Sequence, residues 1–167
     1  IVLRTIKLYL PIGFILLIGS ILRFYNLGQI PWPVFDEVFY PVFAFNYLEG
    51  KNFFSVHPPL GSYLLSLGIY LYHLLPWTEV INFGITDIKD INPLAFRWVS
   101  ALSGVMLIYV GYKLALEIFN QRGFALLVAL FLTLDGSLLV DSRLGLINIF
   151  FSLFGLMAML FFIKYLI

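Results

Sequence analysis

The chain of 167 residues has no cysteine, which excludes a disulfide framework and a thiolate metal site. Charged side chains are scarce as well: they make up 11% of the residues, whereas a soluble domain carries roughly a quarter. The net charge of +1 gives no electrostatic basis for binding nucleic acid. We therefore expect neither a disulfide-stabilised scaffold nor a nucleic-acid-binding protein.

Hydrophobic residues are plentiful, at 62%, and the mean hydropathy is +1.00. Because so few polar groups cannot cover the surface of a soluble protein, we expect lipid to cover it. The apolar segments predict an all-α, polytopic membrane helix bundle. Its membrane helices are predicted at about 8–25, 94–116, 123–140 and 145–165. The chain starts at Ile1 and stops within an apolar run, so we expect it to be the N-terminal part of a larger membrane protein. The sequence leaves open whether that membrane is a bacterial plasma membrane or the endoplasmic reticulum.

An outer loop is predicted at 26–93, with interfacial helices. Residues 37–48 resemble an amphipathic helix, and 58–75 form an apolar segment with prolines near both ends. At about 18 residues and 1.5 Å per residue, this second segment is long enough to span a bilayer. It is therefore either a membrane helix or a re-entrant, surface-lying one.

Lysine and arginine mark the cytoplasmic ends of membrane helices. The basic sites are Arg4 with Lys7, Lys113 with Arg122, and Lys164. All three sites lie inside only if segment 58–75 does not cross, so we prefer that topology. It also places seven ionisable residues on the outer face: Asp36, Glu37, His57, Arg97, Asp135, Asp141 and Arg143. Arg23, Trp32 and Trp77 are interpreted as interfacial anchors.

Two adjacent carboxylates, Asp36 and Glu37, follow the first apolar segment. A carboxylate in a partly dry site can act as a general base. The alternative is that the pair caps the helix that follows, since acids are favourable at a helix start.

His57 precedes two prolines, which favour an extended entry and then a helix start. The free N–H groups of such a start attract anions, so His57 is a candidate for binding phosphate. The alternative is a simple helix-entry turn with a surface histidine.

Arg97 and Arg143 lie within or beside apolar segments, where an unpaired charge is costly. Because guanidinium groups bind phosphate in a bidentate manner, both are candidate phosphate ligands. The alternative is that each arginine pairs with Asp135 or Asp141, or extends to the interface.

Five segments follow one another along the chain: FDEV at 35–38, VHPPLG at 56–61, FRWVSAL at 96–102, LDG at 134–136 and SRL at 142–144. This ordered set resembles the N-terminal region of protein O-mannosyltransferases, which are polyprenyl-phosphate-sugar-dependent glycosyltransferases with the C-type membrane fold. The resemblance covers about residues 30–165. Two positions depart from the family pattern: Ser62 stands where lysine is usual, and Asn148 where aspartate is usual.

The resemblance implies transfer of a sugar, with mannose expected, from dolichyl or polyprenyl phosphate to a Ser or Thr hydroxyl of a protein, with inversion. Asp36 is then the catalytic base. Substrate binding falls to Glu37, His57, Arg97, Asp135 and Arg143. The implied partners are the lipid-phosphate sugar donor, a protein acceptor and membrane lipid, and the family also forms dimers. No cofactor is predicted; Asp36, Glu37 and Asp135 have the oxygen ligands that Mg²⁺ or Mn²⁺ prefers, but we do not favour a metal.

Other functions are compatible with parts of the pattern. One is the same reaction class with another acceptor, such as aminoarabinose transfer to lipid A, although those relatives tend to have lysine where this chain has His57. A transporter would use intramembrane acids and arginines as a path, but here the polar residues cluster at segment ends. A structural membrane subunit would tolerate loss of the Asp36 carboxylate.

Overall fold

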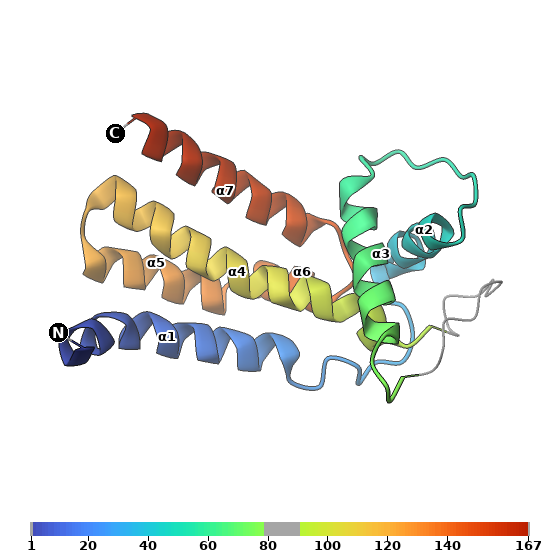
Figure 1. Cartoon of the computed structure of the whole chain (residues 1–167), viewed down its shortest axis with the longest axis horizontal. Coiled ribbons are helices and arrows are strands. Elements are labelled where there is room, and N and C mark those ends of the chain that lie inside the picture. The colour runs from blue at the N-terminus through green and yellow to red at the C-terminus, as the bar shows by residue number, and fades with distance from the viewer. Residues whose placement is uncertain (1, 79–90, 167) are drawn as a thin grey trace.

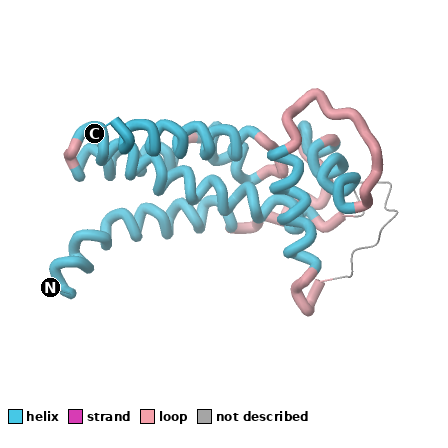
Figure 2. The backbone as a smooth tube through the Cα atoms, turned by 45° about the horizontal axis from the view of Figure 1, so that its top comes forward, coloured by secondary structure: helices cyan, strands magenta, loops and turns pink. Residues whose placement is uncertain are grey.

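The computed structural model describes residues 2–78 and 91–166, which form helices joined by loops, without a strand in those ranges (Figure 2). This confirms the expected all-α chain. The helices are α1 (Val2–Phe24), the 3-10 helix η1 (Phe35–Val38), α2 (Tyr40–Leu48), α3 (Leu60–His73), α4 (Pro93–Phe119), α5 (Arg122–Leu134), α6 (Gly136–Arg143) and α7 (Asn148–Leu166).

Helices α1, α4, α5 and α7 run alongside one another, and α4 packs against all three others (Figure 1). The chain ends and the α4–α5 turn lie at one end of this bundle, whereas α2 and α3 lie at the other. An ion pair of 3.5 Å between Lys164 and Glu117 joins α7 to α4 near the first end. By length and composition, α4 and α7 can each cross a membrane, and α5 with α6 form a third candidate if the bent pair is one span.

Helix α3 lies across the end of the bundle rather than along it (Figure 1). It has 14 residues, or about 21 Å at the α-helical rise, less than the roughly 30 Å of a bilayer core. Gly68 allows α3 to approach Val99 of α4 closely, and the Trp98 indole N–H donates to the Gly68 carbonyl at 3.0 Å. The helix within segment 58–75 is thus shorter than a bilayer core and lies across the bundle (Figure 1). That this segment does not cross the membrane stays a prediction.

The expected continuous helix at 123–140 is instead broken at Asp135. Helices α5 and α6 meet there at a bend of 57°. Asp135 has an extended backbone, and its carboxylate accepts a hydrogen bond from the Leu138 N–H at 2.8 Å, as an N-cap does. The break follows from the side chain, because an aspartate competes with the backbone for hydrogen bonds within a helix.

Arg23 is fully buried, so its interpretation as an interfacial anchor is wrong. Its guanidinium donates to the carbonyls of Leu132 (3.2 Å) and Thr133 (3.5 Å), at the end of α5. These carbonyls lose their helical partners at the break, and a cation is favourable at a helix C-terminus. Gly104 of α4 makes room for the arginine, because a Cβ there would lie 2.7 Å from the Arg23 Nε. Arg23 of α1 thus supplies hydrogen bonds to the carbonyls that the helix break leaves without partners.

Candidate active site

A buried ion pair between Glu37 and Arg97 lies at the end of the bundle where α2 and α3 lie (Figure 1). The Arg97 Nη2 is 2.6 Å from Glu37 Oε2, and the Arg97 Nε donates to Oε1 at 2.8 Å. The two residues are 0% and 1% exposed. Arg97 belongs to the first turns of α4 and Glu37 to η1, so the pair joins the segment that follows α1 to the central helix. The alternative in which Arg97 pairs with Asp135 or Asp141 is therefore wrong, because its partner is Glu37.

The guanidinium of Arg97 uses all five of its N–H donors within the protein. Besides the two bonds to Glu37, its Nη1 donates to the carbonyls of Leu27 (3.3 Å) and Ile30 (2.8 Å). Its Nη2 also donates to the carbonyl of Trp32 at 3.1 Å. Arg97 therefore holds the irregular segment between α1 and η1 and has no donor left for a phosphate.

The carboxylate of Glu37 is equally occupied. Its Oε2 accepts from the Val34 N–H at 2.8 Å, and its Oε1 accepts from the Gly145 N–H at 2.6 Å. With the two bonds from Arg97, each oxygen accepts two hydrogen bonds, which is its usual capacity. Glu37 therefore connects η1, α4 and the segment between α6 and α7. This arrangement points to a positioning role rather than to the substrate-binding role that the resemblance implies for Glu37 and Arg97.

Asp36 lies beside this network with its side chain half-buried. Within the part of the chain that the structure describes, its carboxylate makes no hydrogen bond or ion pair. Asp36 contributes its main-chain carbonyl to the Phe39 N–H, and the side chain that caps η1 belongs to Glu37. The capping alternative therefore holds for Glu37, whereas the Asp36 carboxylate lies in the first turn of η1 without making a capping hydrogen bond.

His57 is exposed and lies against Tyr40, with 5.5 Å between the ring centroids in an edge-on arrangement. Tyr40 is the first residue of α2 and is buried. Burial and, to a lesser extent, the nearby Asp36 carboxylate raise the pKa of the Tyr40 phenol above its ordinary value. Tyr40 thus lies near both predicted site residues. Sequence reasoning missed it, although its position four residues after Asp36 was a usable signal.

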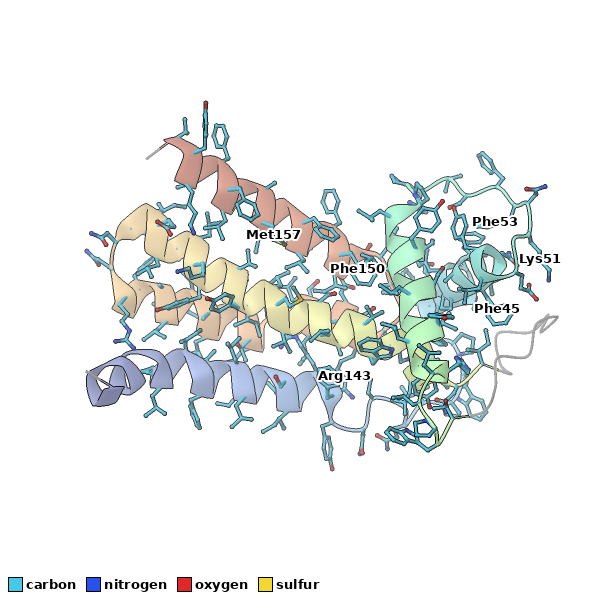
Figure 3. All side chains as sticks on the ribbon, viewed as in Figure 1. Phe45, Lys51, Phe53, Arg143, Phe150 and Met157 are labelled. Carbon is cyan, nitrogen blue, oxygen red and sulfur yellow. The ribbon has the colours of Figure 1, made fainter. Side chains whose placement is uncertain are left out.

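Arg143 is the last residue of α6 and lies beside the end of α1 (Figure 3). Its Nη1 donates to the carbonyls of Leu22 (2.6 Å) and Arg23 (3.4 Å). Its Nε and Nη2 have no hydrogen-bond partner among residues 2–78 and 91–166, so Arg143 retains donors for an anion. Two residues further along the chain, Gly145 donates to Glu37.

Asp135 is exposed, and its carboxylate serves as the N-cap of α6. In the described ranges, no three His, Asp or Glu side chains gather as metal ligands. Asp36, Glu37 and Asp135 therefore do not form the carboxylate cluster considered from the sequence. Of the two departures from the family pattern, Ser62 is buried in α3, and Asn148 is the exposed first residue of α7.

The family model and the similar proteins found by comparison all point to one family. The family model described as dolichyl-phosphate-mannose-protein mannosyltransferase matches residues 13–166. Protein O-mannosyltransferase 1 of Drosophila pseudoobscura is 36% identical over 121 residues, covering 72% of this chain and 13% of the relative. Protein O-mannosyl-transferase 1 of Mus musculus is 28% identical over 152 residues, covering 89% and 20%.

A bacterial relative matches too. The polyprenol-phosphate-mannose–protein mannosyltransferase of Mycolicibacterium smegmatis is 26% identical over 151 residues, covering 84% of this chain and 26% of the relative. The chain thus spans between 13% and 26% of the length of these three relatives. No solved structure matches it.

Proposed function

The chain belongs to the dolichyl-phosphate-mannose-protein mannosyltransferase family, and from that premise we propose that it carries the catalytic base of a protein mannosyltransferase. The donor is mannose on a dolichyl or polyprenyl phosphate, and the acceptor is a Ser or Thr hydroxyl of a protein. The names of the relatives favour this reaction over aminoarabinose transfer, a transporter or a structural subunit.

The observation that carries the proposal is the contrast between two neighbouring carboxylates. Glu37 is buried and its hydrogen-bonding capacity is filled, whereas Asp36 is half-buried without a hydrogen-bond partner in the described residues. Because Glu37 anchors η1 to α4, the free carboxylate of Asp36 is held on a rigid part of the bundle. A general base needs this combination of a fixed position and an open lone pair.

The reaction is a displacement at the anomeric carbon. Asp36 accepts the proton of the acceptor hydroxyl as the hydroxyl oxygen forms its bond to the anomeric carbon. The bond from that carbon to the phosphate oxygen breaks, and the lipid phosphate leaves with the electron pair. Attack from the face opposite the leaving group inverts the configuration.

Negative charge develops on the leaving phosphate, so a cation aimed there stabilises the transition state. Arg143 has unused guanidinium donors, and the exposed His57 ring is also open to a ligand. Arg97 is excluded from this role by its own hydrogen bonds. We therefore assign the phosphate to Arg143 and His57, and structural support to Arg97.

A lipid-linked donor requires a site at the bilayer surface. We propose that the protein is multi-pass, with α1, α4, the α5–α6 pair and α7 crossing the membrane and α2 and α3 lying at its outer or luminal face. The chain termini and the α4–α5 turn lie at the same end of the bundle, which supports this topology (Figure 1). Dimerisation, which the family resemblance implies, stays a prediction.

The test is transfer of labelled mannose from a polyprenyl-phosphate donor to an acceptor peptide by the full-length protein. Asp36→Asn keeps the size of the side chain and removes the base, so we expect kcat to fall at least about 100-fold, the lower range for general base catalysis. Asp141→Asn is the matched control, since Asp141 is a half-buried acid outside the proposed site. Undiminished transfer by Asp36→Asn removes Asp36 as the base.

A further inference from the structure

We propose that Tyr40 is a positioning residue of this site, whose ring holds the His57 imidazole in the orientation that receives the leaving phosphate. The inference rests on the proposed function, because it gives a substrate-facing role to His57. It adds a residue that neither the sequence nor the family assignment identified.

The His57 side chain needs an external support. The segment between α2 and α3 has no regular secondary structure around His57. Its main chain is held locally, since the His57 N–H donates to the Ser55 hydroxyl at 3.2 Å. That bond leaves the imidazole free to rotate about its side-chain torsions. Within the described ranges, the imidazole makes no hydrogen bond, so the ring contact with Tyr40 determines its direction.

Tyr40 is suited to this support because it is immobile. Its side chain is buried, 6% exposed, in the core cluster with Ala44 and Phe45 of α2. Pro41 follows it in the first turn of α2 and restricts the backbone there. The edge-on approach of two rings at 5.5 Å is also the arrangement that aromatic quadrupoles favour. A rigid tyrosine therefore orients a histidine that belongs to an irregular segment.

Electrostatics at Tyr40 agree with this placement. The Asp36 carboxylate contributes to the raised pKa of the Tyr40 phenol, so the tyrosine lies within electrostatic reach of the proposed base. The phenol then stays neutral at physiological pH and adds no charge beside Asp36. Tyr40 therefore contacts His57, the proposed phosphate-binding residue, and lies near Asp36, the proposed base.

Two substitutions in the full-length protein separate the ring from the hydroxyl. Tyr40→Phe keeps the ring edge, so we expect mannosyl transfer within about twofold of the wild type. Tyr40→Leu removes the edge, and we expect kcat/KM to fall about tenfold, mainly through a higher KM for the lipid donor, since misplaced groups lose binding energy. Tyr112→Leu controls for a general core defect, because Tyr112 is a buried tyrosine of α4 in a core cluster separate from that of Tyr40.

A double variant tests the route through His57. Tyr40→Leu combined with His57→Ala is expected to lose no more activity than His57→Ala alone, because residues that act as a unit are not additive. Additive losses would overturn the proposal, as would wild-type activity of Tyr40→Leu or an equal loss in Tyr112→Leu.

A chemical readout keeps the inference separate from the proposed function. Diethyl pyrocarbonate modification of His57, followed by mass spectrometry, is expected to accelerate in Tyr40→Leu but not in Tyr40→Phe. His73 is the internal reference, because its Nδ1 already pairs with the Ile69 carbonyl at 2.7 Å. Unchanged His57 reactivity in Tyr40→Leu contradicts the positioning role. If the wild-type protein transfers no mannose, the proposed function fails, while the reactivity comparison still decides the role of Tyr40.

Discussion

At the scale of single residues, two adjacent carboxylates of similar chemistry differ in burial and in hydrogen bonding. Asp36 and Glu37 differ by one methylene, yet Glu37 is fully enclosed and Asp36 is open to a ligand. In a 3-10 helix, neighbouring side chains point about 120° apart, so only one of the two can face α4. The helix thereby assigns one carboxylate to structure and leaves the other for chemistry.

The Glu37–Arg97 pair makes a prediction about stability. Arg97→Leu leaves the Glu37 carboxylate buried without its cation, which typically costs about 3–5 kcal/mol. Removing both charges with Glu37→Leu and Arg97→Leu is expected to be less destabilising than Arg97→Leu alone, because no lone charge remains. Thermal unfolding of the purified protein in detergent measures both. A double variant that loses the sum of the two single effects would contradict a coupled pair.

Residue types in the sequence pointed to several members of the site but not to their partners. Asp36, His57 and Arg143 stand out because ionisable side chains are rare in so apolar a chain. Arg97 stands out in the same way, yet its partner lies 60 residues away, and nothing local distinguishes Glu37 from Asp141 in that role. Tyr40 was missed because it is one tyrosine among ten, and its spacing of four residues from Asp36 singles it out only once its neighbours in the fold are known.

At the scale of elements, the close packing of the broken α5–α6 pair against α4 depends on a glycine. A Cβ on Gly104 would lie 2.5 Å from the Ser142 Cβ and 2.7 Å from the Arg23 Nε. Because Arg23 is buried and bonded to the end of α5, it has little room to move. Gly104 therefore allows α4, α1 and α6 to meet.

We expect Gly104→Ala to destabilise the bundle by about 1–3 kcal/mol, the usual cost of overpacking. The matched control is Gly155→Ala in α7, where a Cβ has nothing within 4 Å. That change should be neutral or stabilising by up to about 1 kcal/mol, since alanine is the better helix former. Melting temperatures of the two variants provide the comparison, and equal stability would show that the contact at Gly104 relaxes freely.

Helix existence was predictable where hydropathy runs are long, as in α4 and α7. Breaks within helices were not predictable, because a hydropathy average over many residues hides the effect of a single one. Asp135 and Gly136 are two residues in an otherwise apolar stretch, and the break becomes stable only when Arg23 of α1 and the Asp135 side chain satisfy the two new helix ends. That compensation is tertiary, so no local pattern reveals it.

At the scale of the whole molecule, the proposed topology places both ends of α3 on the same side of the membrane. The chain has no cysteine, so single cysteines introduced at Ser55, Trp77 and Asn120 have no background within it. We expect an impermeant thiol reagent to label Ser55→Cys and Trp77→Cys from the outer or luminal side and Asn120→Cys from the opposite side only. Labelling of Ser55→Cys and Trp77→Cys from opposite sides would mean that α3 crosses.

The network around Glu37 also has a consequence for the order in which the protein is made. The Glu37 carboxylate is hydrogen-bonded to Arg97, which follows it by 60 residues in the sequence, and to the Gly145 N–H, which follows it by 108 residues. During synthesis from the N-terminus, the segment between α1 and α2 therefore leaves the ribosome long before the Glu37 carboxylate has partners. Until α4 and the segment after α6 have been inserted, Glu37 must remain hydrated. The earliest part of the site to be synthesised is thus completed late in the assembly of this bundle.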